Sequence, residues 1–271
     1  MTTSRYDRVF QIADKENRGI FIPFVVVGDP DMESSIHIMQ TLIDAGADAL
    51  ELGIPFSDPV ADGPTIQAAV LRALNANATP TRCFDAIAQI RKRNAEVPIG
   101  ILTYANAVFQ TSLDEYFANV ATAGIDSVLT ADMPVFEAAE YAAAAKSHAV
   151  CPVFIAPPNA RDTDLEQIAT MGSGYTYVVA RSGVTGCDKE IGSSFDETIK
   201  RLKQFRSPPP VVGFGISQPA HVASVISAGA HGAISGSKVA QIMELNRNSV
   251  EGRTSALSHF VKIMKQATIR R

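Results

Sequence analysis

Two acidic residues, eleven positions apart, carry the clearest chemistry in the sequence: Glu51 and Asp62. Leu50 and Leu52 share one face of a short predicted strand, so Glu51, with small residues on either side, points the other way. A carboxylate that is removed from water favours its neutral form, which raises its pKa toward the range useful for acid–base catalysis. A structural ion pair is the alternative, but the predicted strands contain no Lys or Arg. We therefore predict a catalytic role for Glu51.

The loop after this strand, residues 54–64, contains three prolines and both Asp58 and Asp62, and it leads into a predicted helix. Taken singly, each aspartate is best interpreted as a turn residue or a helix cap. Beside an inward glutamate on the preceding strand, they become candidates for the same site. The sequence gives no distance between them.

Two glycine clusters near the end of the chain predict an anion site. They are Gly213–Ser217 and Ser235–Lys238, each directly after a predicted strand. Glycine lets backbone N–H groups approach a phosphate, and the start of a helix adds positive potential. Such a site needs few cations, which suits a stretch, residues 207–237, that has no Asp, Glu, Lys or Arg. Tight turns that need glycine for backbone reasons are the alternative.

The segment Arg181–Gly192 has three glycines and mixed polar residues, as expected of a lid that excludes water, although a plain disordered loop is equally consistent. Before it, Tyr175 and Tyr177 share one face of a predicted strand. They are either core residues or residues of the site, where their hydroxyls would find partners.

Several kinds of catalytic site are disfavoured by the sequence. The five histidines show no HxH or HExxH spacing, the three cysteines form no CxxC pair, and no lysine lies in a predicted strand. A metal site, a zinc site and a Schiff-base lysine are therefore not expected. The chemistry that remains is proton transfer by carboxylates on a phosphorylated metabolite.

Short β-branched runs alternate with amphipathic helical patterns along the whole chain, and eight such units can be counted. The predicted strands are Phe21–Val27, Ala49–Leu52, Ile99–Thr103, Ser127–Thr130, Val153–Ile155, Tyr175–Val179, Val211–Phe214 and Ala233–Ser235. Eight units favour a (β/α)8 TIM barrel over an open doubly wound sheet, because the first strand is not followed by a glycine-rich turn. We predict a single α/β barrel domain over residues 1–271, with an additional N-terminal helix at Tyr6–Asn17.

Composition narrows the partners and the location. The formal net charge is −4 and there is no basic stretch, so nucleic acid is not expected as a partner. The N-terminus lacks the apolar core of a signal peptide, and the longest apolar run, residues 19–28, is too short to cross a membrane. We expect a cytoplasmic protein without membrane contact.

The segment Leu50–Gln67, with Glu51, Asp58 and Asp62, strongly resembles the signature of the tryptophan synthase alpha chain family. The resemblance continues in order along the chain through Pro23–Pro30, Tyr104–Asn106, Gly174–Tyr177, Arg181–Gly186, Gly213–Ser217 and Gly232–Ser237. The sequence departs from the family pattern at Ala180–Ser182 and at Lys238, which bears on lid closure and phosphate affinity.

The resemblance implies a lyase that splits indole-3-glycerol phosphate into indole and glyceraldehyde 3-phosphate. By the same resemblance Glu51 protonates the indole ring, Asp62 accepts the indole N–H, Tyr177 helps position them, and Thr185 engages Asp62 on closure. The implied phosphate ligands are Gly186, Gly215, Gly236 and Ser237, and the implied indole slot consists of Phe24, Leu102, Leu129 and Phe214.

The resemblance also implies an α2β2 complex in which indole passes through a tunnel to a beta subunit that holds pyridoxal phosphate. This chain would carry no cofactor, and Asp58 and the segment Tyr104–Phe109 would lie near the partner. Two alternatives remain: another phosphate-binding barrel enzyme, such as indole-glycerol-phosphate synthase, and a non-catalytic regulatory subunit.

Overall fold

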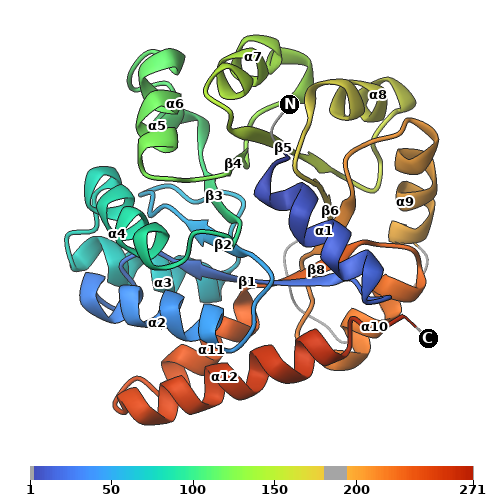
Figure 1. Ribbon diagram of the computed structural model, residues 1–271. Helices are drawn as coiled ribbons and strands as arrows, with labels where there is room; N and C mark the ends of the chain where they lie inside the picture. Colours follow the sequence, from blue (N-terminus) through green and yellow to red (C-terminus); the bar gives the residue numbers. More distant parts are fainter. Residues whose placement is uncertain (1–2, 180–193, 271) are drawn as a thin grey trace.

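The computed structural model describes residues 3–179 and 194–270, and within them eight parallel strands close into a barrel in sequence order (Figure 1). The last strand pairs with the first through Ile20–Pro23 and Gly232–Ser235, which closes the ring. Both the barrel and the additional N-terminal helix predicted from the sequence are confirmed. The strands are β1 (Ile20–Val26), β2 (Leu50–Gly53), β3 (Ile99–Thr103), β4 (Ser127–Thr130), β5 (Cys151–Ala156), β6 (Thr176–Val179), β7 (Pro210–Gly213) and β8 (Gly232–Ser235).

Helices surround the barrel and cover the outer faces of its strands (Figure 1). They are α1 (Arg5–Lys15), α2 (Met32–Asp44), α3 (Pro64–Asn75), α4 (Pro80–Arg93), α5 (Ala105–Val108), α6 (Leu113–Thr122), η1 (Val135–Glu137), α7 (Ala139–Ser147), α8 (Asp162–Met171), α9 (Ser194–Gln204), α10 (Pro219–Ser227), α11 (Ser237–Leu245) and α12 (Val250–Gln266). Among the described helices, none is long and apolar enough to cross a membrane.

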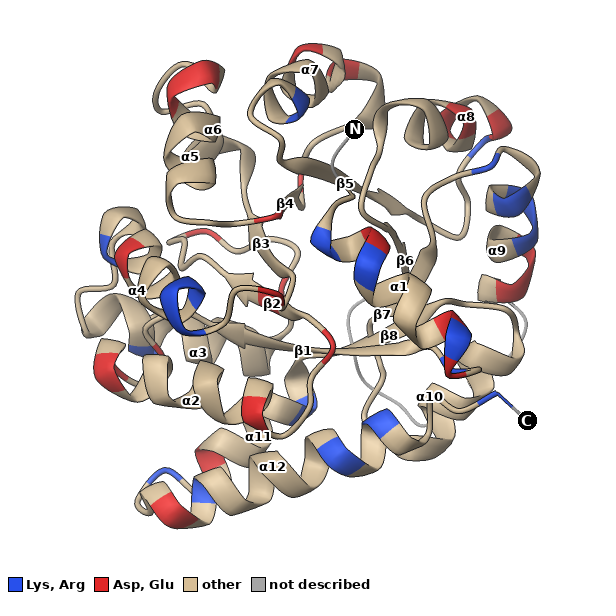
Figure 2. Ribbon diagram, viewed as in Figure 1, with Lys and Arg blue, Asp and Glu red and all other residues tan. Residues whose placement is uncertain are grey.

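The strands are buried on both faces, as parallel strands inside a layer of helices must be. All seven residues of β1 are buried, as are all four of β2, β4, β7 and β8. Charged side chains therefore lie mainly on the helices and loops around the barrel (Figure 2). A charged side chain within a strand, such as Glu51, stands out against this pattern.

Helix α1 lies across the amino-terminal end of the barrel (Figure 1). It begins after Ser4, whose side chain accepts the N–H of Asp7 in a capping box. From the inner face of α1, Tyr6 enters the barrel, where its hydroxyl lies 2.9 Å from the Ser127 Oγ and its ring lies 5.4 Å from the ring of Tyr175. The helix thus closes the end of the barrel opposite to the loops that follow the strands.

The amino-terminal end of the barrel is held by buried carboxylates in the turns before the strands. Asp48, which precedes β2, accepts the Phe21 N–H at 2.9 Å and forms ion pairs with Arg18 at 3.0 Å and Lys265 at 2.9 Å. Its side chain is only 3% exposed. One carboxylate therefore joins β1, the turn before β2 and α12.

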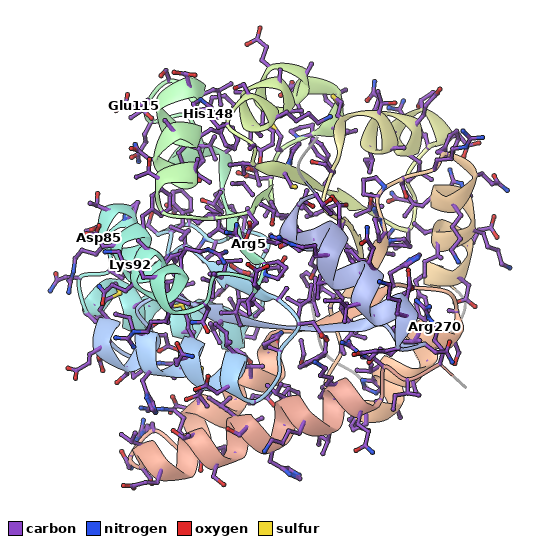
Figure 3. All side chains as sticks on the ribbon, in the orientation of Figure 1. Arg5, Asp85, Lys92, Glu115, His148 and Arg270 are labelled. Atoms are coloured by element: carbon purple, nitrogen blue, oxygen red, sulfur yellow. The ribbon has the colours of Figure 1, made fainter. Side chains whose placement is uncertain are left out.

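Asp48→Ala is expected to destabilise the fold by about 3 kcal/mol, because it removes a buried carboxylate from Arg18 and Lys265 and leaves the Phe21 N–H without its acceptor. Urea unfolding followed by circular dichroism measures the loss. The control is Asp85→Ala on the outer face of α4 (Figure 3), which should change stability by less than about 0.5 kcal/mol. Equal losses in the two variants would contradict the anchoring role of Asp48.

Candidate active site

The carboxyl group of Glu51 lies inside the barrel, as the alternation of Leu50 and Leu52 predicts. Its side chain lines a cavity of about 450 Å³ and the residue is 2% exposed. None of the ion pairs in the described part of the chain involves Glu51, so no cation of that part compensates its charge. Burial raises the pKa of Glu51 to about 7. The hydrogen bond from Tyr175 acts in the opposite direction, but its effect is smaller. The group can therefore hold or release a proton near neutral pH.

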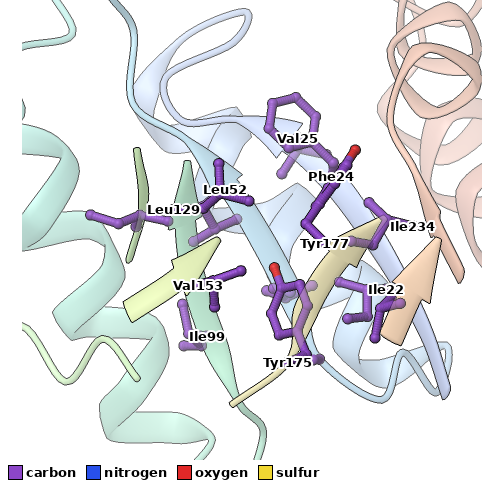
Figure 4. Close-up of a cluster of buried hydrophobic side chains, with 14 of the residues drawn as sticks. Ile22, Phe24, Val25, Leu52, Ile99, Leu129, Val153, Tyr175, Tyr177 and Ile234 are labelled. Atoms are coloured by element: carbon purple, nitrogen blue, oxygen red, sulfur yellow. The ribbon is translucent and has the colours of Figure 1, made fainter. Parts of the chain in front are cut away.

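Tyr175 positions this carboxyl group, a contact that the sequence did not predict. Its hydroxyl donates to Glu51 Oε1 at 2.5 Å, and both side chains are buried. The ring of Tyr175 rests on Tyr6 from α1. Figure 4 shows Tyr175 and Tyr177 on the same side of β6, which confirms the shared face. The tyrosine alternation was visible in the sequence, but the partner of each hydroxyl was not.

Asp62 lies at the mouth of the same cavity, on the loop between β2 and α3. Gly63, not Asp62, caps α3, so the helix-cap interpretation of Asp62 is wrong. Its carboxylate accepts a hydrogen bond of 2.9 Å from the Tyr104 hydroxyl, and burial raises its pKa. The Tyr104 ring stacks on Phe56 at 5.2 Å, so the aspartate is held from β3 rather than by its own loop alone.

Tyr177 also lines the cavity, and its hydroxyl lies against Gly213 at the end of β7. Gly213 is the residue before Phe214, which has a positive φ of 68°. A Cβ atom on Gly213 would overlap the Tyr177 ring, so that position requires glycine. Tyr177 therefore packs against the turn that places Phe214 and Gly215 at the cavity.

The predicted anion site forms one side of the cavity. Gly215, Ser217, Gly236 and Ser237 all line it. Gly236 precedes the first residue of α11, and no side chain caps that helix. The first N–H groups of α11 are therefore available to an anion, and they carry the positive end of the helix dipole. This arrangement agrees with the interpretation of the two glycine clusters as an anion site.

Apolar side chains complete the cavity wall. Phe24, Leu102 and Phe214 line it, together with Ile66, Ile216 and Ile234, which the sequence analysis had not singled out. Leu129 is not among the lining residues: it is buried in β4, paired in register with Leu102 of β3. Thr185 and Gly186 lie outside the described residues. Asp58 is exposed on the β2–α3 loop and does not line the cavity.

The arrangement suits acid–base chemistry on a ligand with an apolar ring and an anionic end. A protonatable carboxyl lies deep in the cavity, a second carboxylate lies at its mouth, and the uncapped start of α11 lies at the predicted anion site. In the part of the chain that the structure describes, no group of three or more His, Cys, Asp or Glu residues is placed to hold a metal ion.

Folding stability should depend on the ionisation of Glu51. Its pKa is higher in the folded protein, about 7, than its ordinary value of 4.5, so the folded state binds more protons and loses stability as pH rises between these values. Glu51→Gln replaces the ionisable group with a neutral one and so removes this loss of stability at high pH. We expect the variant to be more stable than the unmodified chain by roughly 3 kcal/mol at pH 8, with little difference at pH 4.

Urea unfolding at the two pH values tests this expectation, with Glu166→Gln on the exposed face of α8 as the control that should change little at either pH. A Glu51→Gln variant that is no more stable than the unmodified chain at pH 8 would show that Glu51 is not desolvated as the geometry indicates.

Comparisons with known proteins place the chain in a family. The family profile described as tryptophan synthase alpha chain matches residues 10–269. The tryptophan synthase alpha chain of Shewanella oneidensis is 51% identical over 265 residues, which are 98% of this chain and 95% of the relative. That of Vibrio cholerae is also 51% identical over 265 residues, 98% of this chain and 99% of the relative.

Solved structures agree with the sequence comparison. The alpha chain from Legionella pneumophila superposes with a TM-score of 0.88 at 26% identity and covers 98% of both chains. A chain of the tryptophan synthase α2β2 complex from Pyrococcus furiosus gives a TM-score of 0.82 at 33% identity, over 92% of this chain and 98% of that one. With a profile match over almost its whole length, this chain belongs to the tryptophan synthase alpha chain family.

Proposed function

We propose that this chain cleaves indole-3-glycerol phosphate to indole and glyceraldehyde 3-phosphate, and that the cavity at the carboxyl ends of the strands is its active site. Membership of the tryptophan synthase alpha chain family supports the reaction. The observation that carries the assignment of the site is the buried Glu51, whose pKa is raised to about 7 in a cavity shared with Asp62 and the start of α11.

Glu51 in its protonated form donates a proton to the indole carbon that bears the glycerol phosphate chain. Asp62 accepts a hydrogen bond from the ring N–H and stabilises the positive charge that develops on the ring. The bond between that carbon and the side chain then breaks, and its electron pair restores the aromatic ring. The adjacent hydroxyl loses its proton as it becomes the aldehyde, and the Glu51 carboxylate can accept that proton.

The remaining site residues bind and orient the substrate. Phe24, Leu102 and Phe214 pack on the indole ring, and Gly215, Gly236 and Ser237 bind the phosphate. Tyr177 packs against Gly213, directly before Phe214, and so acts as a positioning residue. Leu129, which supports Leu102 from the neighbouring strand, would affect the ring pocket indirectly. Thr185 and Gly186 belong to the proposal on the resemblance alone.

Glu51→Gln and Asp62→Asn should each lower the rate of indole release by at least about 100-fold, because each removes a proton donor or acceptor from the reaction. Both should keep the affinity for glycerol 3-phosphate within a few-fold, since neither removes a phosphate contact. Indole release is measured directly, with Asp85→Asn as the surface control. Near-normal turnover in either site variant would refute the role of that residue.

The indole-release assay also distinguishes the proposed function from the two alternatives, another phosphate-binding barrel enzyme and a non-catalytic regulatory subunit. An indole-glycerol-phosphate synthase would form the substrate named above rather than consume it, and a regulatory subunit would bind phosphate ligands without any release of indole. Indole release by the unmodified chain, alone or with a beta subunit, contradicts both alternatives.

We further propose that the chain acts in an α2β2 complex with a tryptophan synthase beta chain, to which it passes indole and which holds pyridoxal phosphate. The Pyrococcus furiosus relative is described as part of such an α2β2 complex. Three apolar side chains lie exposed in the segments that follow β2, β3 and β4, near the mouth of the barrel: Val60 (80%), Phe109 (52%) and, in η1, Phe136 (65%). Asp58 lies on the same loop as Val60, so these residues form a candidate partner surface.

Phe109→Asp is expected to weaken binding of a beta chain by at least about tenfold, because it places a charge in an apolar contact. Leu71→Asp, at an exposed leucine on α3 outside the partner surface, is the matched control. Binding is measured by titration calorimetry, and the intrinsic indole release of the free chains shows that both variants fold. Equal weakening by the two substitutions would contradict the placement of the partner surface.

We also propose that the chain works as one domain and in the cytoplasm. All eight strands belong to one closed barrel, so no strand remains for a second sheet among the described residues. The described cysteines, Cys83 and Cys151, are both free thiols, as is usual in a reducing compartment.

A further inference from the structure

The position of Lys238 in α11 is unfavourable for the helix itself. Lys238 is the second residue of α11, which begins at Ser237. The start of a helix carries partial positive charge, so acidic residues stabilise it there and a cation destabilises it. α11 has neither an acidic residue in its first turn nor a capping side chain to offset this effect. Helix stability therefore does not account for a lysine at this position.

Packing and pairing do not account for it either. Lys238 is half-buried, and no hydrogen bond or ion pair joins its ammonium group to any described residue. The acidic residue of α11, Glu244, lies near the other end of the helix and is paired with Arg72 and Arg247. The ammonium group of Lys238 is thus left without an anionic partner in the described part of the chain.

Lys238 lines the active-site cavity. Among the described lining residues only three are charged: the acidic Glu51 and Asp62, and the basic Lys238. Two carboxylates oppose the entry of an anionic ligand, and the glycine-rich turns offer partial charges only. Lys238 adjoins Gly236 and Ser237 in sequence, so the one full positive charge of the described wall lies at the anion site.

We propose that the Lys238 ammonium group binds the phosphate of the substrate and makes this chain select the phosphorylated over the unphosphorylated ligand by charge. The inference rests on the proposed function, and it adds a residue at which the sequence departs from the family pattern. Lys238 is a binding residue in this account. It takes no part in the proton transfers, so its loss should raise KM and leave kcat nearly unchanged.

The experiment compares Lys238→Gln, Lys238→Arg and the control Lys262→Gln, an exposed lysine on α12. Glycerol 3-phosphate, inorganic phosphate and indole serve as probes, with affinities measured by titration calorimetry on the full chain. Lys238→Gln should weaken glycerol 3-phosphate and inorganic phosphate about tenfold, as expected for one charge-assisted contact. Lys238→Arg should keep most of the affinity, Lys262→Gln should keep all of it, and indole should bind all variants equally.

The salt dependence of phosphate binding distinguishes a binding role of Lys238 from a merely structural one. Between low and physiological ionic strength, the affinity of the unmodified chain for glycerol 3-phosphate should fall more steeply than that of Lys238→Gln. The melting temperature of Lys238→Gln should be equal or higher, since it removes a cation from the start of a helix.

Unchanged phosphate affinity in Lys238→Gln, or an equal loss for indole and phosphate ligands, would overturn the inference. These binding measurements do not depend on turnover. If the unmodified chain binds phosphate through Lys238 but releases no indole, the proposed function fails while the inference stands. If it releases indole and Lys238→Gln retains the KM of the unmodified chain, the inference fails and the proposed function stands.

Discussion

The removal of one carboxyl group from water is the constraint on which the rest of the site depends. Glu51 lies on a strand inside a closed ring of eight, where neither solvent nor a described cation stabilises its charge. The neutral form is therefore favoured until about pH 7. The hydrogen bond from Tyr175 works against this shift and keeps the carboxyl group in one orientation. Burial thus determines the pKa of Glu51, and Tyr175 determines the orientation of its carboxyl group.

Such a group costs stability, and the opposite end of the barrel offsets that cost. Carboxylates there are paired: the buried Asp48 with Arg18 and Lys265, and the partly buried Asp126 with Arg5 at 2.7 Å and Arg91 at 2.6 Å. Asp29, buried after β1, is likewise paired with Arg72, so Glu51 differs from these carboxylates in having no described cation as partner. Pairing at the amino-terminal end fixes the barrel, whereas the absence of a described cation near Glu51 leaves it able to exchange a proton.

Helix α1 connects these two ends. Its Tyr6 reaches the Ser127 hydroxyl at 2.9 Å and packs against Tyr175, the residue that donates to Glu51. A helix that covers the base of the barrel therefore also supports the orientation of the reactive carboxyl group. At the mouth, Tyr104 donates to Asp62, and Tyr177 packs against Gly213 at the turn of Phe214. Three tyrosines from two strand ends thus orient the polar parts of the site.

The sequence determined the barrel, the inward direction of Glu51 and the glycine turns that line the cavity, because each depends on local pattern. Strand alternation places Leu50 and Leu52 opposite Glu51, and glycines after a strand mark the turns that approach a ligand. The partners of the reactive groups were decided by the tertiary structure. Tyr175 lies 124 positions from Glu51, and Tyr104 lies 42 positions from Asp62. The cap of α3, the position of Leu129 behind the cavity wall and the lack of a described partner for Lys238 likewise follow from packing. No local pattern encodes them, because each depends on which distant side chain the closure of the barrel brings alongside.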